Sequence, residues 1–260
     1  MGHPGRERRY MMVLVFLLKR CAGVAVAVFI WAALVRFFEI PPYMLPGPER
    51  VFVAFQNQGL FLLHHASITF SETLLGFVFG VVAGCLLAIL IWVFPVAKRA
   101  IMPTILVTQA LPVFAIAPIL VLWLGFGLAS KIVMAVLVIF FAVTSTFYDG
   151  LRRLDPGLSD LSRLYRVSRL KELWVFRLPS AMPALASGLR IAAVFAPIGA
   201  IVGEWVGAKG GLAFIMLQSN ARMQTDVMFA ALILLALMVL SLRFAVDHFT
   251  RFLVPWQVED

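Results

Sequence analysis

No charged side chain occurs between Ala100 and Ser130, a stretch longer than the roughly 20 residues that a helix needs to cross a bilayer. The segment from Leu74 to Val93 is uncharged as well. Over the whole chain 62% of residues are hydrophobic and 13% are charged, whereas globular domains carry about 25% charged residues. The sequence therefore predicts an integral membrane protein with no room for a separate soluble domain.

The fold class predicted is all-α, a polytopic membrane protein with six transmembrane helices. The spans are expected at about residues 21–38, 66–94, 102–124, 132–148, 185–206 and 227–247. Together they form one permease domain over residues 21–256, after a basic cytosolic segment at 1–20. Four prolines between Pro41 and Pro48 predict an extended crossing after the first span.

The distribution of cations predicts the orientation. With both termini in the cytosol, 17 of the 22 Lys and Arg residues lie on the cytosolic side, as the positive-inside rule requires. The net charge of +9 then reflects topology and anionic lipid headgroups, and no nucleic-acid partner is expected.

A basic loop at 149–183 separates the fourth and fifth spans. Its seven cations are Arg152, Arg153, Arg163, Arg166, Arg169, Lys171 and Arg177. Asp155 and Pro156 predict the start of a helix over 156–172, with Asp155 as N-cap. That helix either docks its apolar side in a partner's groove or lies on anionic lipid. Leu178-Pro179 and Pro183 predict a bend before the fifth span.

Candidate residues of a solute path interrupt the apolar spans. Gln109 needs a cavity or a neighbouring helix for its amide, and Pro112 and Pro118 either free carbonyls toward a pore or only kink the helix. Glu204 is either a gate residue or an interfacial anchor. Glu72 is expected at a surface or a helix end, and Arg190 is expected to extend toward the cytosolic interface.

The loop resembles the cytosolic coupling segment of ATP-binding-cassette importer permeases, in its order of acid, small residue, basic helix and Leu-Pro before a span. Other fragments resemble the nitrate/sulfonate/taurine-type branch of those permeases. They are Ile40–Pro46, Thr73–Phe77, Gln109–Pro112, Ala117–Pro118, Leu122–Gly127, Gly188–Ala192 and Gly203–Glu204. The resemblance covers about residues 37 to 256.

This resemblance implies a homodimer in the bacterial inner membrane, with membrane lipid around it, two cytosolic ATP-binding subunits and an extracytoplasmic solute-binding protein. ATP and Mg²⁺ belong to the ATPase, since this chain lacks a GxxxxGK[ST] loop and is expected to hold no cofactor and to be no enzyme. The residues implied in ATPase coupling are Asp160, Ser162, Arg163, Arg166, Ser168, Leu178 and Pro179.

The sequence departs from the family where coupling is concentrated. The family's Glu-Ala-Ala triplet falls on Asp160, Leu161 and Ser162, and its glycine falls on Arg166. Because arginine disfavours the positive φ that glycine adopts freely, we expect either a shallower bend or a partner groove adapted to Arg166.

Two other classes of function are less well supported. An ion-coupled secondary transporter or channel needs carboxylates in mid-membrane, and the central parts of the second, third, fourth and sixth spans have none. A membrane enzyme needs a paired nucleophile and base, and the sequence shows no such cluster. The segments Gly203–Ala208 and Gln224–Ala231 look similar to permeases for pyrimidine precursors of thiamine. Such a precursor is therefore one candidate solute, and sulfonates and nitrate are the others.

Overall fold

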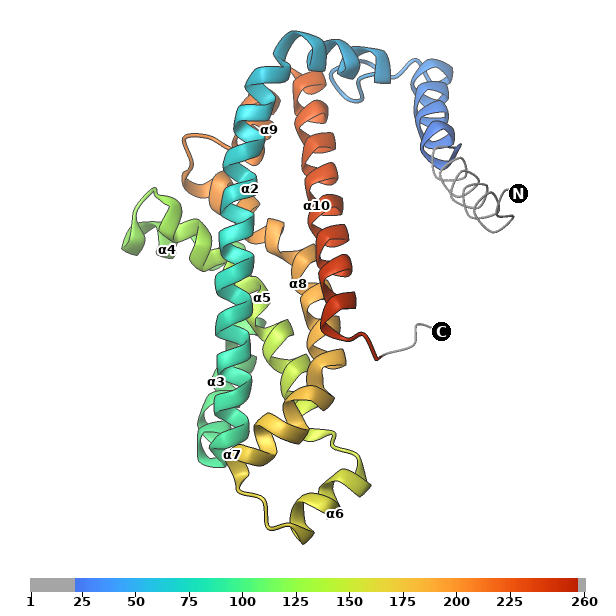
Figure 1. Ribbon diagram of the computed structural model, residues 1–260. Helices are drawn as coiled ribbons and strands as arrows, with labels where there is room; N and C mark the ends of the chain where they lie inside the picture. The colour runs from blue at the N-terminus through green and yellow to red at the C-terminus, as the bar shows by residue number, and fades with distance from the viewer. Residues whose placement is uncertain (1–21, 257–260) are drawn as a thin grey trace, which may run out of the picture. The chain divides into compact units, whose positions relative to one another are not determined.

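The computed structural model describes residues 22–256, apart from the side chains of residues 106 and 108–110, and shows helices and turns without strands in that range (Figure 1). The helices, in chain order, are Ala22–Phe37, α2 Pro48–Val93, α3 Pro95–Ala110, α4 Val113–Leu124, α5 Leu128–Arg152, α6 Pro156–Leu164, α7 Arg169–Glu172, the π-helix η1 Leu173–Arg177, α8 Leu178–Gly207, α9 Leu212–Ala221 and α10 Thr225–Leu253. The all-α prediction is confirmed. The basic segment predicted at 1–20 lies outside the described residues.

The chain forms two compact units. The first comprises Met1–Gly59 and Gln218–Ala230, and the second comprises Leu60–Leu217 and Ala231–Asp260. Three helices, α2, α9 and α10, continue from one unit into the other. Within α2 the backbone leaves helical geometry at Gln58 (φ −124°, ψ 18°), next to the unit boundary. The single permease domain over 21–256 stays a prediction.

Within residues 22–256, four helices are long and apolar enough to cross a membrane: Pro48–Val93, Leu128–Arg152, Arg169–Gly207 and Thr225–Leu253. The predicted spans at 132–148, 185–206 and 227–247 lie within three of them, and the span at 66–94 lies within Pro48–Val93 except for its last residue. The span predicted at 21–38 coincides with the shorter apolar helix Ala22–Phe37, whereas only the second half of the span at 102–124 coincides with one, Val113–Leu124. Of these six, the second begins much earlier than predicted, because Pro48 occupies the first helical position instead of ending an extended segment.

The predicted third span is divided in the structure. Helix α3 ends at Ala110, Leu111 and Pro112 are extended (ψ 124° and 126°), and α4 begins at Val113. Pro112 has no N–H to continue the α3 ladder, and it restricts Leu111 to the extended region. Helix α4 then ends at Gly125, whose φ of 80° is costly for any residue with a Cβ.

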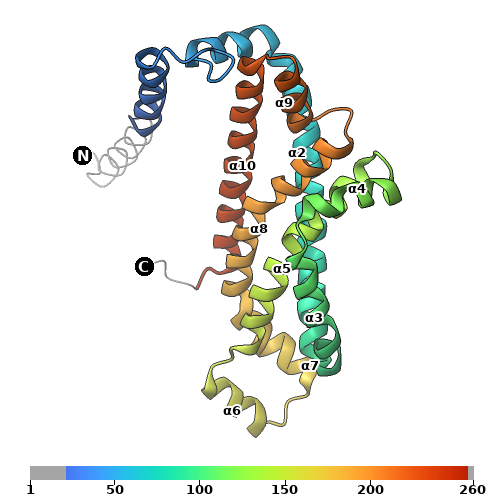
Figure 2. The ribbon, with the colours of Figure 1, turned by 180° about the vertical axis from the view of Figure 1, so that it is seen from behind.

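The core of the second unit is the packing of α5 against α8, which lie side by side in both views (Figure 1, Figure 2). Small residues bring the two backbones close. A Cβ built on Gly199 would lie 2.2 Å from Cα of Ala135. Larger side chains, among them Ile139 and Val143, fill the rest of this interface and are fully buried. Close backbone approach through small residues is typical of helix packing in membranes.

The first unit joins the proline segment to the start of α10. The hydroxyl of Thr225 donates to the Pro42 carbonyl (2.6 Å), and the rings of Trp31 and Phe229 stack with centroids 6.1 Å apart. Residues 40–47 are non-helical, as predicted, but they are not extended throughout. A turn forms there, with the N–H of Met44 donating to the Pro41 carbonyl (2.9 Å).

Candidate functional site

The basic loop begins with a capped helix. The Asp155 carboxylate accepts a hydrogen bond from the N–H of Gly157 (2.8 Å), and Pro156 takes the first helical position of α6. A proline fits there because the first N–H groups of a helix have no partner within the helix. The predicted start of this helix is confirmed. Its predicted end at residue 172 is wrong, since α6 stops at Leu164.

Arg166 closes the end of α6 in a left-handed conformation, with φ of 49°. Its N–H donates to the Arg163 carbonyl, and the N–H of Val167 donates to the Ser162 carbonyl, both at 3.0 Å. These two bonds form a Schellman motif, in which glycine usually holds the left-handed position. The turn is therefore closed despite the arginine, and the shallower bend offered as one alternative is wrong.

The second half of the loop runs without a break into α8. Helix α7, the π-helical turn η1 and α8 follow one another, and Glu172, Arg177 and Leu178 all keep right-handed helical angles. Pro179 has no N–H for the carbonyl four residues earlier, and the wider turn η1 precedes it directly. The expected bend at Leu178-Pro179 is therefore a π-helical turn within one continuous helix.

Two of the seven cations hold this segment against the ends of membrane helices. Arg169 donates to the Trp92 carbonyl in the last turn of α2 (2.9 Å), and Arg177 donates to the Leu151 carbonyl in the last turn of α5 (2.8 Å). Both guanidinium groups also lie over the Trp92 ring, 5.2 and 5.1 Å from its centroid. Arginines near helix C-termini satisfy carbonyls that lack a partner within the helix.

Arg177 is the better enclosed of the two anchors. It forms a salt bridge with Glu172 (2.7 Å), and a second hydrogen bond joins Nε to the same carboxylate (2.8 Å). Sequence reasoning treated the seven cations alike and missed this division. The signal that could have revealed it is the spacing of Glu172 and Arg177 about one turn apart in an otherwise apolar run.

The remaining residues implied in ATPase coupling are spread over the loop. Asp160 and Arg163 are exposed on α6, with an ion pair of 4.0 Å between them. Ser162 is buried and donates to the Ser159 carbonyl (2.8 Å). Ser168 is exposed at the start of α7, Leu178 is half-buried, and Pro179 is exposed. In Figure 1, α6 lies beyond the ends of α5 and α8, so this part of the loop protrudes from the second unit.

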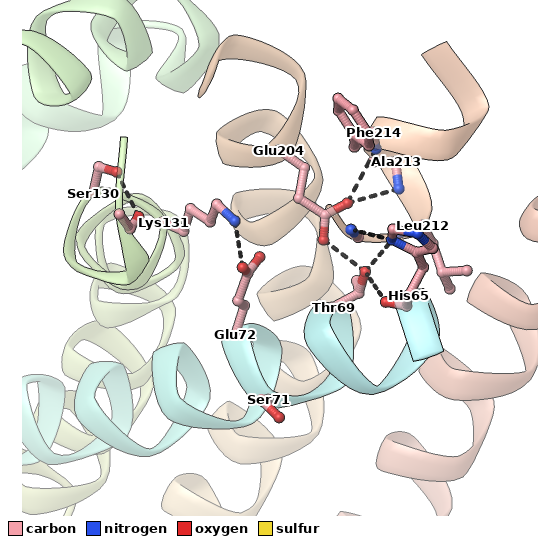
Figure 3. A network of polar contacts seen from close by, with 12 residues as sticks. His65, Thr69, Ser71, Glu72, Ser130, Lys131, Glu204, Leu212, Ala213 and Phe214 are labelled. Atoms are coloured by element: carbon pink, nitrogen blue, oxygen red, sulfur yellow. Dashed lines mark hydrogen bonds and ion pairs between the residues drawn. The ribbon is translucent and has the colours of Figure 1, made fainter. Parts of the chain in front are cut away.

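A buried polar network lies near the opposite end of α8, centred on Glu204 (Figure 3). One oxygen of its carboxylate accepts from the N–H groups of Ala213 (2.7 Å) and Phe214 (3.2 Å), in the first turn of α9. The other oxygen accepts from the hydroxyl of Thr69 (2.6 Å). Glu204 lies 26 residues beyond Leu178, which is about 40 Å of helix.

Helix α2 supplies the rest of the network. The hydroxyl of Thr69 accepts from the N–H of Leu212 (2.7 Å), and Nδ1 of His65 accepts from the N–H of Gly211 (3.0 Å). The unpaired N–H groups at the start of α9 are thus satisfied by side chains of α2 and α8. Since Nδ1 of His65 is an acceptor, it carries no proton in this arrangement.

Lys131, at the start of α5, forms a buried salt bridge with Glu72 of α2 beside this network (Figure 3). Their side chains are 8% and 3% exposed. The prediction that Glu72 lies at a surface or a helix end is therefore wrong. His65, Thr69 and Glu72 share one helical face, and polar residues at spacings of four and three in an apolar helix are the signal that could have found them.

Among the other candidates for the solute path, the two prolines do not join this network. Pro112, which precedes α4, and Pro118 within it are exposed, and the buried face of α4 packs against Met134 and Val202. Gln109 lies in the last turn of α3, and its side chain is outside the described residues. Arg190 pairs with Asp247 of α10 (3.1 Å), and its extension toward the cytosolic interface stays a prediction.

Comparison with known proteins gives the family of this architecture. Residues 76–258 match the binding-protein-dependent transport system inner membrane component family. The chain belongs to this family. A probable ABC transporter permease protein of Haemophilus influenzae is 45% identical over 89% of this chain and 94% of the relative.

A second relative and a solved structure are also similar to this chain. The formylaminopyrimidine transport permease ThiX of Halalkalibacterium halodurans is 33% identical over 83% of this chain and 87% of its own length. A chain of the MetNI methionine ABC transporter, solved in inward-facing conformations, shares the fold with a TM-score of 0.66, 22% identity and coverage of 76% of this chain and 98% of that one.

The permease is thus the membrane subunit of an ATP-driven importer, of the nitrate/sulfonate/taurine-type branch predicted from its sequence. In this family the ATPase is a separate subunit. The ion-coupled transporter or channel is not favoured. Several apolar helices make the permease a multi-pass component of the inner membrane.

Proposed function

We propose that two copies of this permease enclose the path of a small organic or oxyanion solute, and that two cytosolic ATPase subunits drive transport by acting on the loop from α6 to η1. An extracytoplasmic binding protein delivers the solute on the other side. ATP and Mg²⁺ are held by the ATPase subunits. Both termini and the loop lie in the cytosol, as the distribution of cations indicates.

The observation that supports this proposal most directly is that one part of the loop is exposed while the next part is anchored to the membrane helices. Asp160 and Arg163 are exposed on α6, where a soluble subunit can reach them. Arg169 and Arg177 hold the following segment against the last turns of α2 and α5. A protrusion anchored in this way transmits a movement of a soluble partner to the membrane helices, whereas a flexible loop does not.

Among possible solutes, a pyrimidine precursor of thiamine is our first candidate. The support is the 33% identity with a permease named for formylaminopyrimidine transport, together with the segments Gly203–Ala208 and Gln224–Ala231. Sulfonates and nitrate complete the class. Selection among them is expected to rest with the binding protein, which meets the solute first.

For the path itself we propose Gln109, Pro112, Pro118 and Glu204 as candidates. Glu204 has the strongest support, because a buried carboxylate in an apolar segment is costly unless it serves structure or transport. The prolines are supported by their exposure on α4, whose apolar residues a second copy can cover.

The test is uptake of radiolabelled solute by proteoliposomes that contain the permease, its ATPase subunit and its binding protein. We expect uptake that requires ATP on the loop side and is abolished by a catalytically dead ATPase. Uptake driven by an ion gradient without ATP would contradict the proposal. Labelling of Arg163→Cys with a membrane-impermeant reagent tests the orientation. Labelling from the extracytoplasmic side would show that the true orientation is the opposite of the proposed one.

A further inference from the structure

A groove opens between the end of α6 and the segment from α7 to η1. It has a volume of about 480 Å³, and its lining residues are Leu161, Tyr165, Arg166, Val167, Ser168, Lys171, Val175 and Phe176. Five of these are apolar or aromatic, two are cations, and none is an acid. The groove therefore combines an apolar floor with positive charge. It adjoins the end of α6, the helix that protrudes from the second unit in Figure 1.

Arg166 carries an unusual backbone for its residue type. Its φ of 49° belongs to the left-handed region, where a Cβ crowds the following peptide, and glycine would hold the same Schellman turn without that strain. Within the described residues, neither Arg166 nor Lys171 forms an ion pair with an acid of its own chain. The strain is thus retained without an intrachain salt bridge to offset it, and such strain concentrates at functional sites.

We propose that this groove receives an acidic segment of the ATPase, in which a carboxylate contacts Arg166 and Lys171 while a neighbouring apolar side chain fills the floor formed with Val175 and Phe176. The inference rests on the proposed function and adds to it the chemistry of the partner. A guanidinium group binds a carboxylate through two parallel hydrogen bonds, which a glycine cannot replace. Arg166 is then a docking residue that distinguishes this permease from relatives with glycine at the same turn.

An anionic lipid headgroup is a poorer occupant. The groove is concave with an apolar floor, which suits side chains of a protein segment better than a phosphate at a flat membrane surface. An ATPase segment can instead present an acidic side chain to the two cations and an apolar side chain to the floor at the same time.

The experiment measures the affinity of the purified ATPase subunit for the full-length permease in nanodiscs of neutral lipid, with Arg166→Gly as the main variant. Glycine keeps the left-handed turn and removes the cation, so the loop stays folded, as an unchanged or higher apparent Tm will show. We expect affinity to fall about tenfold, a loss typical of one charge-assisted hydrogen-bonded contact. The affinity of Arg166→Lys is expected to lie between those of the wild type and Arg166→Gly. Lys171→Gln is expected to lose as much affinity as Arg166→Gly.

Arg153→Gln is the matched control, because it removes an exposed loop cation outside the groove. Its affinity should stay within twofold of the wild type. Equal or tighter binding by Arg166→Gly would overturn the proposal, as would an equal loss in Arg153→Gln, which would show only an effect of net charge. A loss confined to nanodiscs with phosphatidylglycerol would assign the groove to lipid instead. If the wild-type permease binds no ATPase at all, the proposed function fails together with this inference.

Discussion

Glu204 of α8 caps α9 from a distance, through a 2.7 Å hydrogen bond from the N–H of Ala213 to its carboxylate. Thr69 and His65 complete the cap from α2. Three helices are therefore joined by the start of α9, within the second unit. Backbone N–H groups at a buried helix start need hydrogen-bond partners. Glu204 therefore stabilises the fold, whether or not it also lines the solute path.

Removing the cap is expected to destabilise the permease. Glu204→Ala leaves the N–H groups of Ala213 and Phe214 without their acceptor and removes one of the two acceptors of the Thr69 hydroxyl, which costs about 3 kcal/mol. Glu204→Gln keeps one oxygen and should lose about half as much. The readout is the apparent Tm in detergent. Ser71→Ala is the control, because Ser71 bonds only to the Ser67 carbonyl of its own helix and lies on the far side of α2 in Figure 3. Equal Tm values for Glu204→Ala and Ser71→Ala would refute the cap.

The buried pair of Glu72 and Lys131 should show strong coupling. Lys131→Met leaves the Glu72 carboxylate buried without its counter-charge, at a cost of about 3–5 kcal/mol. Adding Glu72→Gln removes that unpaired charge, so the double variant is expected to be more stable than Lys131→Met alone. A double-mutant cycle on unfolding measures the coupling.

The exposed pair of Asp160 and Arg163 provides the reference cycle, since its side chains are 78% and 81% exposed. Its coupling energy should be below about 1 kcal/mol. Additive effects of the Glu72 and Lys131 substitutions would show that the buried ion pair does not form.

Arg177→Lys should separate ATPase binding from transport. Lysine cannot make both the paired contact with Glu172 and the bond to the Leu151 carbonyl, so the loop loses its hold on α5. We expect the ATPase to bind and hydrolyse ATP while solute uptake per ATP falls about fivefold, equivalent to about 1 kcal/mol of coupling. Arg153→Lys, in the same loop, should leave the ratio unchanged. A normal ratio in Arg177→Lys would show that the anchor is not needed for coupling.

The contact of α5 with α8 should not tolerate a methyl group at Gly199. A Cβ there would lie 2.2 Å from Cα and 2.5 Å from N of Ala135, which are backbone atoms that cannot move aside alone. Gly199→Ala is expected to cost about 3 kcal/mol through overpacking. Gly127→Ala is the matched control, since a Cβ there meets nothing within 4 Å and its φ is −117°. A comparison of apparent Tm values decides the matter, and similar values would mean that the helices do not pack this closely.

The sequence predicted the features that depend on local chemistry. The uncharged stretches gave the membrane class, and Asp155 with Pro156 located the start of α6. The backbone preference of the residue type was misleading at Arg166. The left-handed turn there forms despite that preference, and hydrogen bonds to the Arg163 and Ser162 carbonyls close it.

The candidate site was predicted only in part. Glu204 was recognised from its cost in an apolar span, but its partners were not. Thr69 lies 135 residues away on α2, and the N–H groups of the first turn of α9 lie 9 and 10 residues away, beyond the end of α8. No periodicity reveals a contact over such a separation. The position of Glu72 was mispredicted for the same reason, because its partner Lys131 lies 59 residues further along the chain.

The π-helical turn at Leu173–Arg177 sets the rotational phase between the loop and the helix that follows. Such a turn holds one residue more than an ordinary helical turn, and each residue of an α-helix rotates the chain by about 100°. Shortening this turn by one residue would therefore swing α6 and Asp160 about a third of a revolution around the axis of α8. The direction in which the protrusion faces is thus set by a single extra residue in the helical segment that follows it.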